Sequence, residues 1–527
     1  MSLARLLAVA AADVRARLRR PATLVLLGLL LAAASTTFPD PSTGQGILTI
    51  GGKRAVYGSA ALAVATAGLL PVLLGLFGFY AVSNAVGIDR RSGAGRLLGA
   101  TPMTDAEYLL GKLAGSLALL SVVTLAFSAV VMAVQVVHGE APLEPLVFLA
   151  HVLVVALPAL FTVAAFALLF ECVPFLAGRF GDVAYFFVWL VTLTVPVVLA
   201  DSARGTLSPL AAALDGNGLG FLMTEIRRVT GSGELTIGWG GRAAPGAPMV
   251  FPGFDFSAAM LGRRALAFLP PLALLPVALA AFDRFDPARR LGATSVRVSL
   301  LARASALVRP AAARLLAVVV PEEGRPGRPG LVSASLTDLL VTLRLQPLVV
   351  AALPAAALLA LALPPATART LLSAAYVALA FLLADAATRE ERTGLARVFA
   401  ATPGAGGRVT AVKLGGASLA ALLLLVPLAA KAAVERPLAL PAAVAGGLAA
   451  AALAVALGTA TGSPKPFVGL LLAAWYLALN DQGRTPALDL AGFTGAATAS
   501  SVAGWLLAAA LLAAAAFAAG RLRSWRD

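Results

Sequence analysis

The chain has 527 residues, of which 60% are hydrophobic and only 13% are charged. A soluble domain carries roughly 25% charged residues, so this composition excludes an ordinary soluble fold. Apolar stretches of about 20 residues, the length needed to cross a bilayer, recur along the chain and predict a polytopic membrane protein.

The formal net charge is +15, but the Lys and Arg residues lie mostly between apolar runs and are not interleaved with aromatic side chains. The positive-inside rule explains this distribution better than nucleic-acid binding does, so we expect no nucleic-acid partner. The single cysteine, Cys172, excludes an internal disulfide framework, and the two histidines leave little for a metal ion. No metal or cofactor is expected in this chain.

The N-terminal half begins with residues 3–20, where apolar positions alternate with arginines at near-helical spacing. This pattern predicts an amphipathic elbow helix in the cytoplasmic interface, ending where Pro21 turns the chain into the membrane. The first apolar run lacks a small-residue cleavage site, which favours an uncleaved anchor. Transmembrane helices are predicted near residues 22–38, 59–87, 109–137, 145–170, 173–200 and 258–282.

Residues 283–330 interrupt this pattern with nine arginines against four acidic residues, and end in the Gly- and Pro-rich stretch 324–330. They predict a basic cytoplasmic linker. A second elbow helix, 333–345, then leads to the second half. Its transmembrane helices are predicted near residues 347–363, 370–388, 411–434, 439–460, 465–480 and 502–520.

The predicted domains are therefore two transmembrane domains, 1–290 and 333–527, joined by a linker at 291–332. The expected fold class is an all-α polytopic membrane protein with about twelve transmembrane helices in two pseudo-symmetric six-helix bundles. Arginines are densest at both ends of the chain and in the linker, which predicts a multi-pass protein of the plasma (inner) membrane with cytoplasmic termini. Residues 39–58, the turn 138–144 and residues 201–257 are then expected outside.

A charged segment is duplicated within the chain. Residues 89–102 return as residues 390–403 at a constant offset of 301 residues (402 − 101 = 301), and each copy lies between two apolar runs. Low-complexity Ala/Leu sequence does not produce matches in Arg, Gly, Pro and Lys. The alternative to a functional loop is a solvated loop whose arginines only set the membrane topology. The matching positions are Arg91, Gly93, Arg96, Ala100, Thr101, Pro102, Lys112, Leu113 and Gly115 with Arg392, Gly394, Arg397, Ala401, Thr402, Pro403, Lys413, Leu414 and Gly416.

The first copy of this loop is expected to be ordered. Residues 104–107, Thr-Asp-Ala-Glu, fit a capping box at the start of the third span, with Thr101 and Pro102 closing the preceding segment. In the second copy, residues 404–407 are Gly-Ala-Gly-Gly and Arg408 replaces the glutamate. We expect the second loop to be looser, with weaker coupling.

The chain resembles the permease subunit of an ABC-2 type ATP-binding-cassette transporter. The resemblance rests on the elbow helix, the six-span unit and the loop pattern acid-basic-x-Gly-x-x-x-Leu-Leu-x-x-Thr-Pro, and it covers 1–290 better than 333–527. It implies that residues 89–107 and 390–408 contact a cytoplasmic ATPase and transmit its closure to the helices. The candidate coupling residues are Asp89, Arg91, Gly93, Arg96, Thr101, Pro102, Glu107, Glu390, Arg392, Gly394, Arg397, Thr402 and Pro403, with Glu171, Arg179 and Asp182 as a secondary contact.

The sequence contains no Gly-x-x-x-x-Gly-Lys-Ser/Thr pattern, so ATP and Mg are expected on a separate ATPase, as a dimer, and no catalytic residue is expected here. The predicted function is export, or movement between leaflets, of an amphipathic or hydrophobic substrate. The alternatives are a secondary transporter, a non-transporting scaffold or a membrane enzyme. The spans carry few ionisable groups, which disfavours ion coupling. Asn84 and Asp385, also 301 residues apart (385 − 84 = 301), are interpreted as hydrogen-bonding partners.

Overall fold

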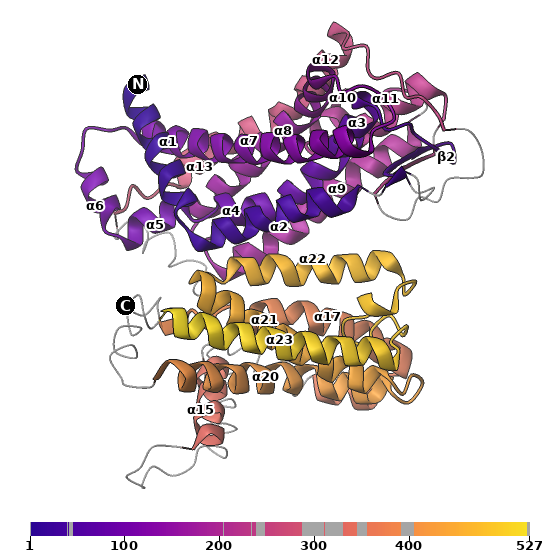
Figure 1. Cartoon of the computed structure of the whole chain (residues 1–527). Helices are drawn as coiled ribbons and strands as arrows, with labels where there is room; N and C mark the ends of the chain where they lie inside the picture. Colours follow the sequence, from indigo (N-terminus) through magenta and orange to yellow (C-terminus); the bar gives the residue numbers. More distant parts are fainter. Residues whose placement is uncertain are drawn as a thin grey trace. The chain divides into compact units, whose positions relative to one another are not determined.

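The computed structural model describes residues 2–38, 40–41, 46–203, 205–232, 234–238, 248–286, 310, 330–344, 356–390 and 405–523. The chain divides into two compact units, Met1–Leu291 and Gly292–Asp527, which are described separately (Figure 1). Within the described ranges, nine helices are long and apolar enough to cross a membrane. The α-helical, polytopic class is thereby confirmed. Twelve spans stay a prediction, because much of 347–363 lies outside the described residues and the helices at 22–38 and 465–480 have only 17 residues each.

The first unit starts with α1 (Leu3–Leu18), the predicted elbow helix, whose buried residues Ala10, Asp13 and Arg17 share one helical face. The predicted span 173–200 begins late in the structure, because residues 173–178 form a turn that ends in Gly178 at a φ of 123°. The apolar helices that follow α1 are α2 (Pro21–Thr37), α3 (Ser59–Leu73), α7 (Asp105–His138), α8 (Pro145–Cys172), α9 (Arg179–Ser202), α12 (Ala258–Ala265) and α13 (Leu269–Ala281).

The second predicted span is not one regular helix. A π-helical turn, Leu74–Gly78, follows Pro71, which lacks the N–H of a regular helix, and then come α4 (Phe79–Val82) and α5 (Ala85–Arg91). Asn84, with a φ of 79°, separates α4 from α5. In the second unit α17 (Pro365–Leu383) ends at the position equivalent to Val82 (383 − 82 = 301), so the duplicated sequence breaks its helix at the same place.

The two segments predicted outside, 39–58 and 201–257, pair with each other. Strand β1 (Leu48–Ile50) lies between β2 (Lys53–Arg54) and β3 (Leu235–Ile237) in an antiparallel sheet, with Thr49 opposite both Arg54 and Thr236. The sequence analysis predicted no strands in these segments, because strands this short carry no periodic signal of their own. Figure 1 shows β2, α10 (Pro209–Leu214), α11 (Leu219–Thr230) and α12 at one end of the unit, with α5 and α6 (Ala94–Gly99) at the other.

The α7–α8 turn is tied to this sheet through Glu140. Its carboxylate accepts two hydrogen bonds from the Arg54 guanidinium, both 2.6 Å long, and one from the Tyr57 backbone N–H at 2.9 Å. The hydrogen bond from Arg54 lowers the pKa of Glu140 below its ordinary value of 4.5. Nearby, the buried His151 receives the Phe254 N–H on Nε2 and contacts the Val147 carbonyl through Nδ1, so it is a packed residue of α8.

The second unit consists of apolar helices rich in alanine. Its elbow helix α15 packs against α20, and α21 packs against α20 and α23. Almost every residue on the buried faces of α21 is Ala or Gly, which lets the backbones approach closely. The helices of this unit are α15 (Leu331–Arg344), α17, α20 (Ala405–Ala432), α21 (Ala439–Thr461), α22 (Lys465–Asp481) and α23 (Ala499–Arg523).

Replacing Glu140 by Gln should lower the free energy of unfolding by about 1 kcal/mol at neutral pH, since it removes a partly exposed ion pair. A carboxylate with a lowered folded pKa stabilises the fold above its unfolded pKa and loses this effect as the pH falls through the folded value. The difference between wild type and variant should therefore decrease as the pH falls below 4.5 and vanish only below the lowered pKa of Glu140 in the folded protein. Denaturant titrations at neutral and acidic pH measure it. Glu144→Gln, at an exposed position in the same turn, is the control, and a pH-independent difference would contradict the assignment.

Candidate functional site

The duplicated loop of the first unit is a short helix held between two caps. Gly93, at a φ of 79°, follows Ser92, the C-cap of α5, and is the N-cap of α6. Thr104 then caps α7: Thr104 Oγ1 accepts the Glu107 N–H at 3.2 Å, and the Glu107 carboxylate accepts the Thr104 N–H at 3.0 Å. The predicted capping box is confirmed. Glu107 also accepts the Ser2 N–H at 2.6 Å, so the loop is tied to the beginning of the elbow helix.

The predicted coupling residues of this loop separate into an outer and an inner group. Arg91, Arg96, Thr101 and Pro102 are exposed, and so is Leu97, whose exposed fraction is 75%. Asp89, Gly93 and Glu107 are half-buried or buried. The outer group forms an exposed face with two arginines and one leucine, and the inner acids bind to the helices behind it.

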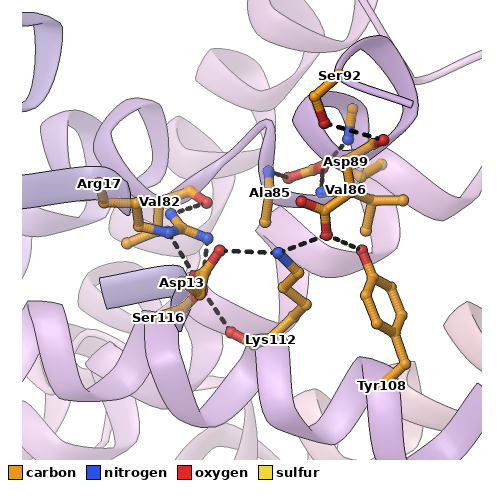
Figure 2. A network of polar contacts seen from close by, with 12 residues as sticks. Asp13, Arg17, Val82, Ala85, Val86, Asp89, Ser92, Tyr108, Lys112 and Ser116 are labelled. Atoms are coloured by element: carbon orange, nitrogen blue, oxygen red, sulfur yellow. Dashed lines mark hydrogen bonds and ion pairs between the residues drawn. The ribbon is translucent and has the colours of Figure 1, made fainter. Parts of the chain in front are cut away.

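Lys112 of α7 lies between two acids from two other elements (Figure 2). Its Nζ is 3.1 Å from Oδ1 of Asp13 in α1 and 2.7 Å from Oδ2 of Asp89 in α5. The Tyr108 hydroxyl donates to the same Asp89 oxygen at 2.7 Å. One ammonium group thus joins the elbow helix, the base of the loop and the third span. Asp13 and Lys112 have side chains only 3% and 7% exposed.

Arg17 completes this cluster on its inner side. Its Nε donates to Oδ2 of Asp13 at 2.6 Å and its Nη2 donates to the Ser116 hydroxyl at 3.2 Å. Its Nη1 donates to the carbonyls of Ala81 and Val82, which end α4. These carbonyls have no partner within their own helix because the helix stops at Val82. A buried guanidinium from the elbow helix therefore donates hydrogen bonds to the carbonyl groups that are left unpaired where the second span is interrupted.

Glu171, a predicted secondary contact, is engaged inside the unit. Its carboxylate accepts the N–H groups of Ala85, Val86 and Gly87 at 2.8, 2.6 and 3.1 Å, so it caps the N-terminus of α5 and matches the positive end of that helix. Asp182 is buried and its carbonyl accepts the Tyr80 hydroxyl, whereas Arg179 is the first residue of α9. Glu171 thus supports the loop from behind.

The second unit repeats the lysine cluster. Lys413 of α20 contacts Asp338 of α15 at 2.6 Å and also Glu390, which follows the end of α17. Arg389 contributes the guanidinium here, with Nη1 3.4 Å from Asp338 and Nη2 2.6 Å from the Thr342 hydroxyl. Each unit therefore places one lysine and one arginine against two carboxylates, with no net charge among the four.

A close helix contact recurs beside each lysine. A Cβ on Gly115 would lie 3.1 Å from the Ala10 carbonyl and 3.1 Å from Cβ of Asp13; on Gly416 it would lie 3.2 Å from the Ser335 carbonyl and 3.1 Å from Cβ of Asp338. Both glycines let an elbow helix approach closely enough for its aspartate to reach the lysine. The 301-residue offset matches Lys112 with Lys413 and Gly115 with Gly416, but it does not match the two aspartates, because Asp13 and Asp338 are 325 residues apart (338 − 13 = 325).

The other predicted residues of the second loop lie outside the described residues, namely Arg392, Gly394, Arg397, Thr402 and Pro403. In the described ranges no group of three His, Cys, Asp or Glu side chains could hold a metal ion. The clusters around Lys112 and Lys413 each join three segments of their unit through ion pairs.

Replacing Lys112 by Met should destabilise the first unit by about 3–5 kcal/mol, because it leaves the carboxylates of Asp13 and Asp89 without their shared cation. Lys413→Met should have a similar effect on the second unit. The exposed Lys53→Met is the matched control and should change the free energy of unfolding by less than about 0.5 kcal/mol. Folded yield and denaturant titrations measure the effect. A Lys112→Met protein as stable as the Lys53→Met protein would show that the cluster does not hold the helices.

Comparisons with known proteins give no assignment for this site. No protein-family model matches the chain, and no curated protein matches it either. The function is therefore inferred from the residues themselves.

Proposed function

We propose that this chain is the membrane-spanning permease of an ABC-2 type exporter, in which α6 and its flanking residues contact a separate cytoplasmic ATPase. The observation that carries the proposal is the combination of an exposed face on the duplicated loop with a base anchored through Lys112. A loop that only set topology would need its arginines but not a helix, a capping box and three charged anchors behind it.

The geometry of the loop fits the transmission of movement. A displacement of α6 would be transmitted directly to α5, and from Asp89 of α5 through Lys112 to α1 and α7. Packed helices joined by short ion pairs move as a body rather than deforming continuously. A partner that closes beneath the loop would therefore tilt the second and third spans together, which is the movement an alternating-access permease requires.

The secondary-transporter alternative is disfavoured by where the buried charges lie. Such a transporter places ionisable groups near the middle of the bilayer. In the described part of the chain, the buried charged residues of the long apolar helices lie within about the first three turns. Examples are Glu107 and Lys112 in α7, Asp182 in α9 and Lys413 in α20. This distribution supports energy delivered at a cytoplasmic loop.

Replacing Arg96 by Glu should weaken the association with the partner ATPase tenfold or more, since an interfacial charge pair lost on one side costs about 2–5 kcal/mol when desolvated and less at a rim. Arg91→Glu should act in the same direction. Arg15→Glu, an exposed arginine on α1, is the control. The measurement is the amount of ATPase that co-purifies with each chain at equal membrane abundance. Unchanged co-purification and ATP-driven transport would remove the loop from the interface.

Cysteine labelling of Leu97→Cys and Val250→Cys, each in a Cys172→Ala background, tests the predicted topology. Both positions are 75% exposed, so accessibility within the fold is matched. An impermeant thiol reagent should label position 250 in intact cells and position 97 only after the membrane is opened, because the basic segments are retained inside. The reverse pattern would place the loop outside and exclude a cytoplasmic ATPase as its partner.

A further inference from the structure

Residues 282–286 directly follow α13 and fold back onto the duplicated loop of the same unit. Asp283 receives Nη2 of Arg90 on both carboxylate oxygens, at 2.7 and 2.8 Å. The Asp283 side chain is only 9% exposed, and that of Arg90 is 24% exposed. A largely buried ion pair thus joins the last helix of the unit to the end of α5, next to Asp89 in the lysine cluster.

Arg284 holds the other end of the loop. Its Nη1 donates to Asp105, the first residue of α7, at 2.9 Å, and its Nη2 donates to the Met103 carbonyl at 3.0 Å and the Thr101 carbonyl at 3.4 Å. One guanidinium therefore spans the turn that connects α6 to α7. Asp283 and Arg284 thus hold the two segments that flank α6, the end of α5 and the turn into α7.

Phe285 fills the space between these two contacts. A Cβ on Gly95 of α6 would lie 2.4 Å from the Phe285 ring, so only glycine allows this approach. The ring also meets Tyr108 edge-on at 5.4 Å, and Tyr108 stacks on Phe282 at 5.5 Å. Because the Tyr108 hydroxyl binds Asp89, these rings connect the buried side of α6 to the lysine cluster.

The backbone of this segment adopts an unfavourable conformation. Arg284 and Phe285 have φ values of 48° and 63°, and two successive non-glycine residues in the left-handed region are rare because Cβ crowds the backbone. Such a conformation persists only where surrounding contacts hold it, and it is typical of functional positions. The contacts with Arg90, Asp105 and Gly95 are what hold it here.

We propose that residues 282–286 are a latch that positions the duplicated loop, so that the end of α13 sets the orientation of the exposed α6 face. The loop is then controlled from two sides: the lysine cluster fixes its base and the 282–286 latch fixes α6. The consequence for coupling rests on the proposed function, whereas the positioning itself is a property of this chain alone.

The decisive variant is Gly95→Ala. Alanine raises the intrinsic helix propensity of α6 but its Cβ would displace the Phe285 ring. If α6 were ordered by its own helicity, amide exchange in residues 94–104 would slow or stay unchanged. If the latch orders it, exchange there should become at least tenfold faster in the purified full chain without any partner. Hydrogen exchange read by mass spectrometry measures this, with amides of α8 as the internal reference for an intact fold.

Arg284→Ala and Phe285→Ala test the same latch from the other side and should also speed exchange tenfold, whereas Arg96→Ala, exposed on α6, should leave it unchanged. A charge-reversed pair, Arg90→Asp with Asp283→Arg, should restore at least part of the protection that Asp283→Arg alone removes. Unchanged loop exchange in Arg284→Ala and Phe285→Ala would overturn the latch, whatever Gly95→Ala does to the fold. Because no partner is present, this outcome is separate from a failure of the proposed function, which the Arg96→Glu co-purification tests.

Discussion

A lysine shared by two carboxylates determines how the helices of each unit meet. Lys112 is buried near the start of an apolar helix, where an unpaired ammonium would be strongly destabilising. It is paired with Asp13 and Asp89, both within contact distance. These two contacts hold the elbow helix and α5 against α7. The break between α4 and α5, the Glu171 cap and the close approach at Gly115 lie around this ammonium group and allow those acids to reach it.

The duplication preserved the charge balance of the cluster rather than its individual residues. The arginine that accompanies the lysine comes from the elbow helix in the first unit, as Arg17, and from the residues after α17 in the second, as Arg389. Arg17 contacts Asp13 from within the same elbow helix, whereas Arg389 contacts Asp338 from a different segment of the unit. A buried cluster of two acids tolerates this exchange because what it needs is two positive charges and the matching hydrogen bonds, not a particular helix to supply them.

The two ends of the first unit are built for different demands. At the loop end, charged side chains from distant segments hold a short helix with an exposed face. At the other end, α10–α12 and the sheet cover the ends of the long helices. There the buried Arg264 donates hydrogen bonds to the carbonyls of Asp215, Val155 and Gly216 at 2.5, 2.5 and 3.0 Å. Burial raises the pKa of Asp215, whose carboxylate receives the N–H groups of Gly220 and Phe221. These polar groups are turned inward to stabilise the cover, whereas Arg96 and Leu97 are turned outward.

The sequence by itself determined the features that depend on neighbouring residues. Apolar length placed most of the described long helices within a few residues, the Thr104–Glu107 spacing specified the capping box, and the 301-residue offset marked the loop. Only the tertiary structure decided which faces meet. The contacts of Asp13 with Lys112 and of Arg90 with Asp283 join residues 99 and 193 positions apart, and the pairing of β1 with β3 joins two segments without any periodic signal. Helical periodicity fixes the face on which a charge lies, but the partner of that charge depends on packing between helices, which no local pattern encodes.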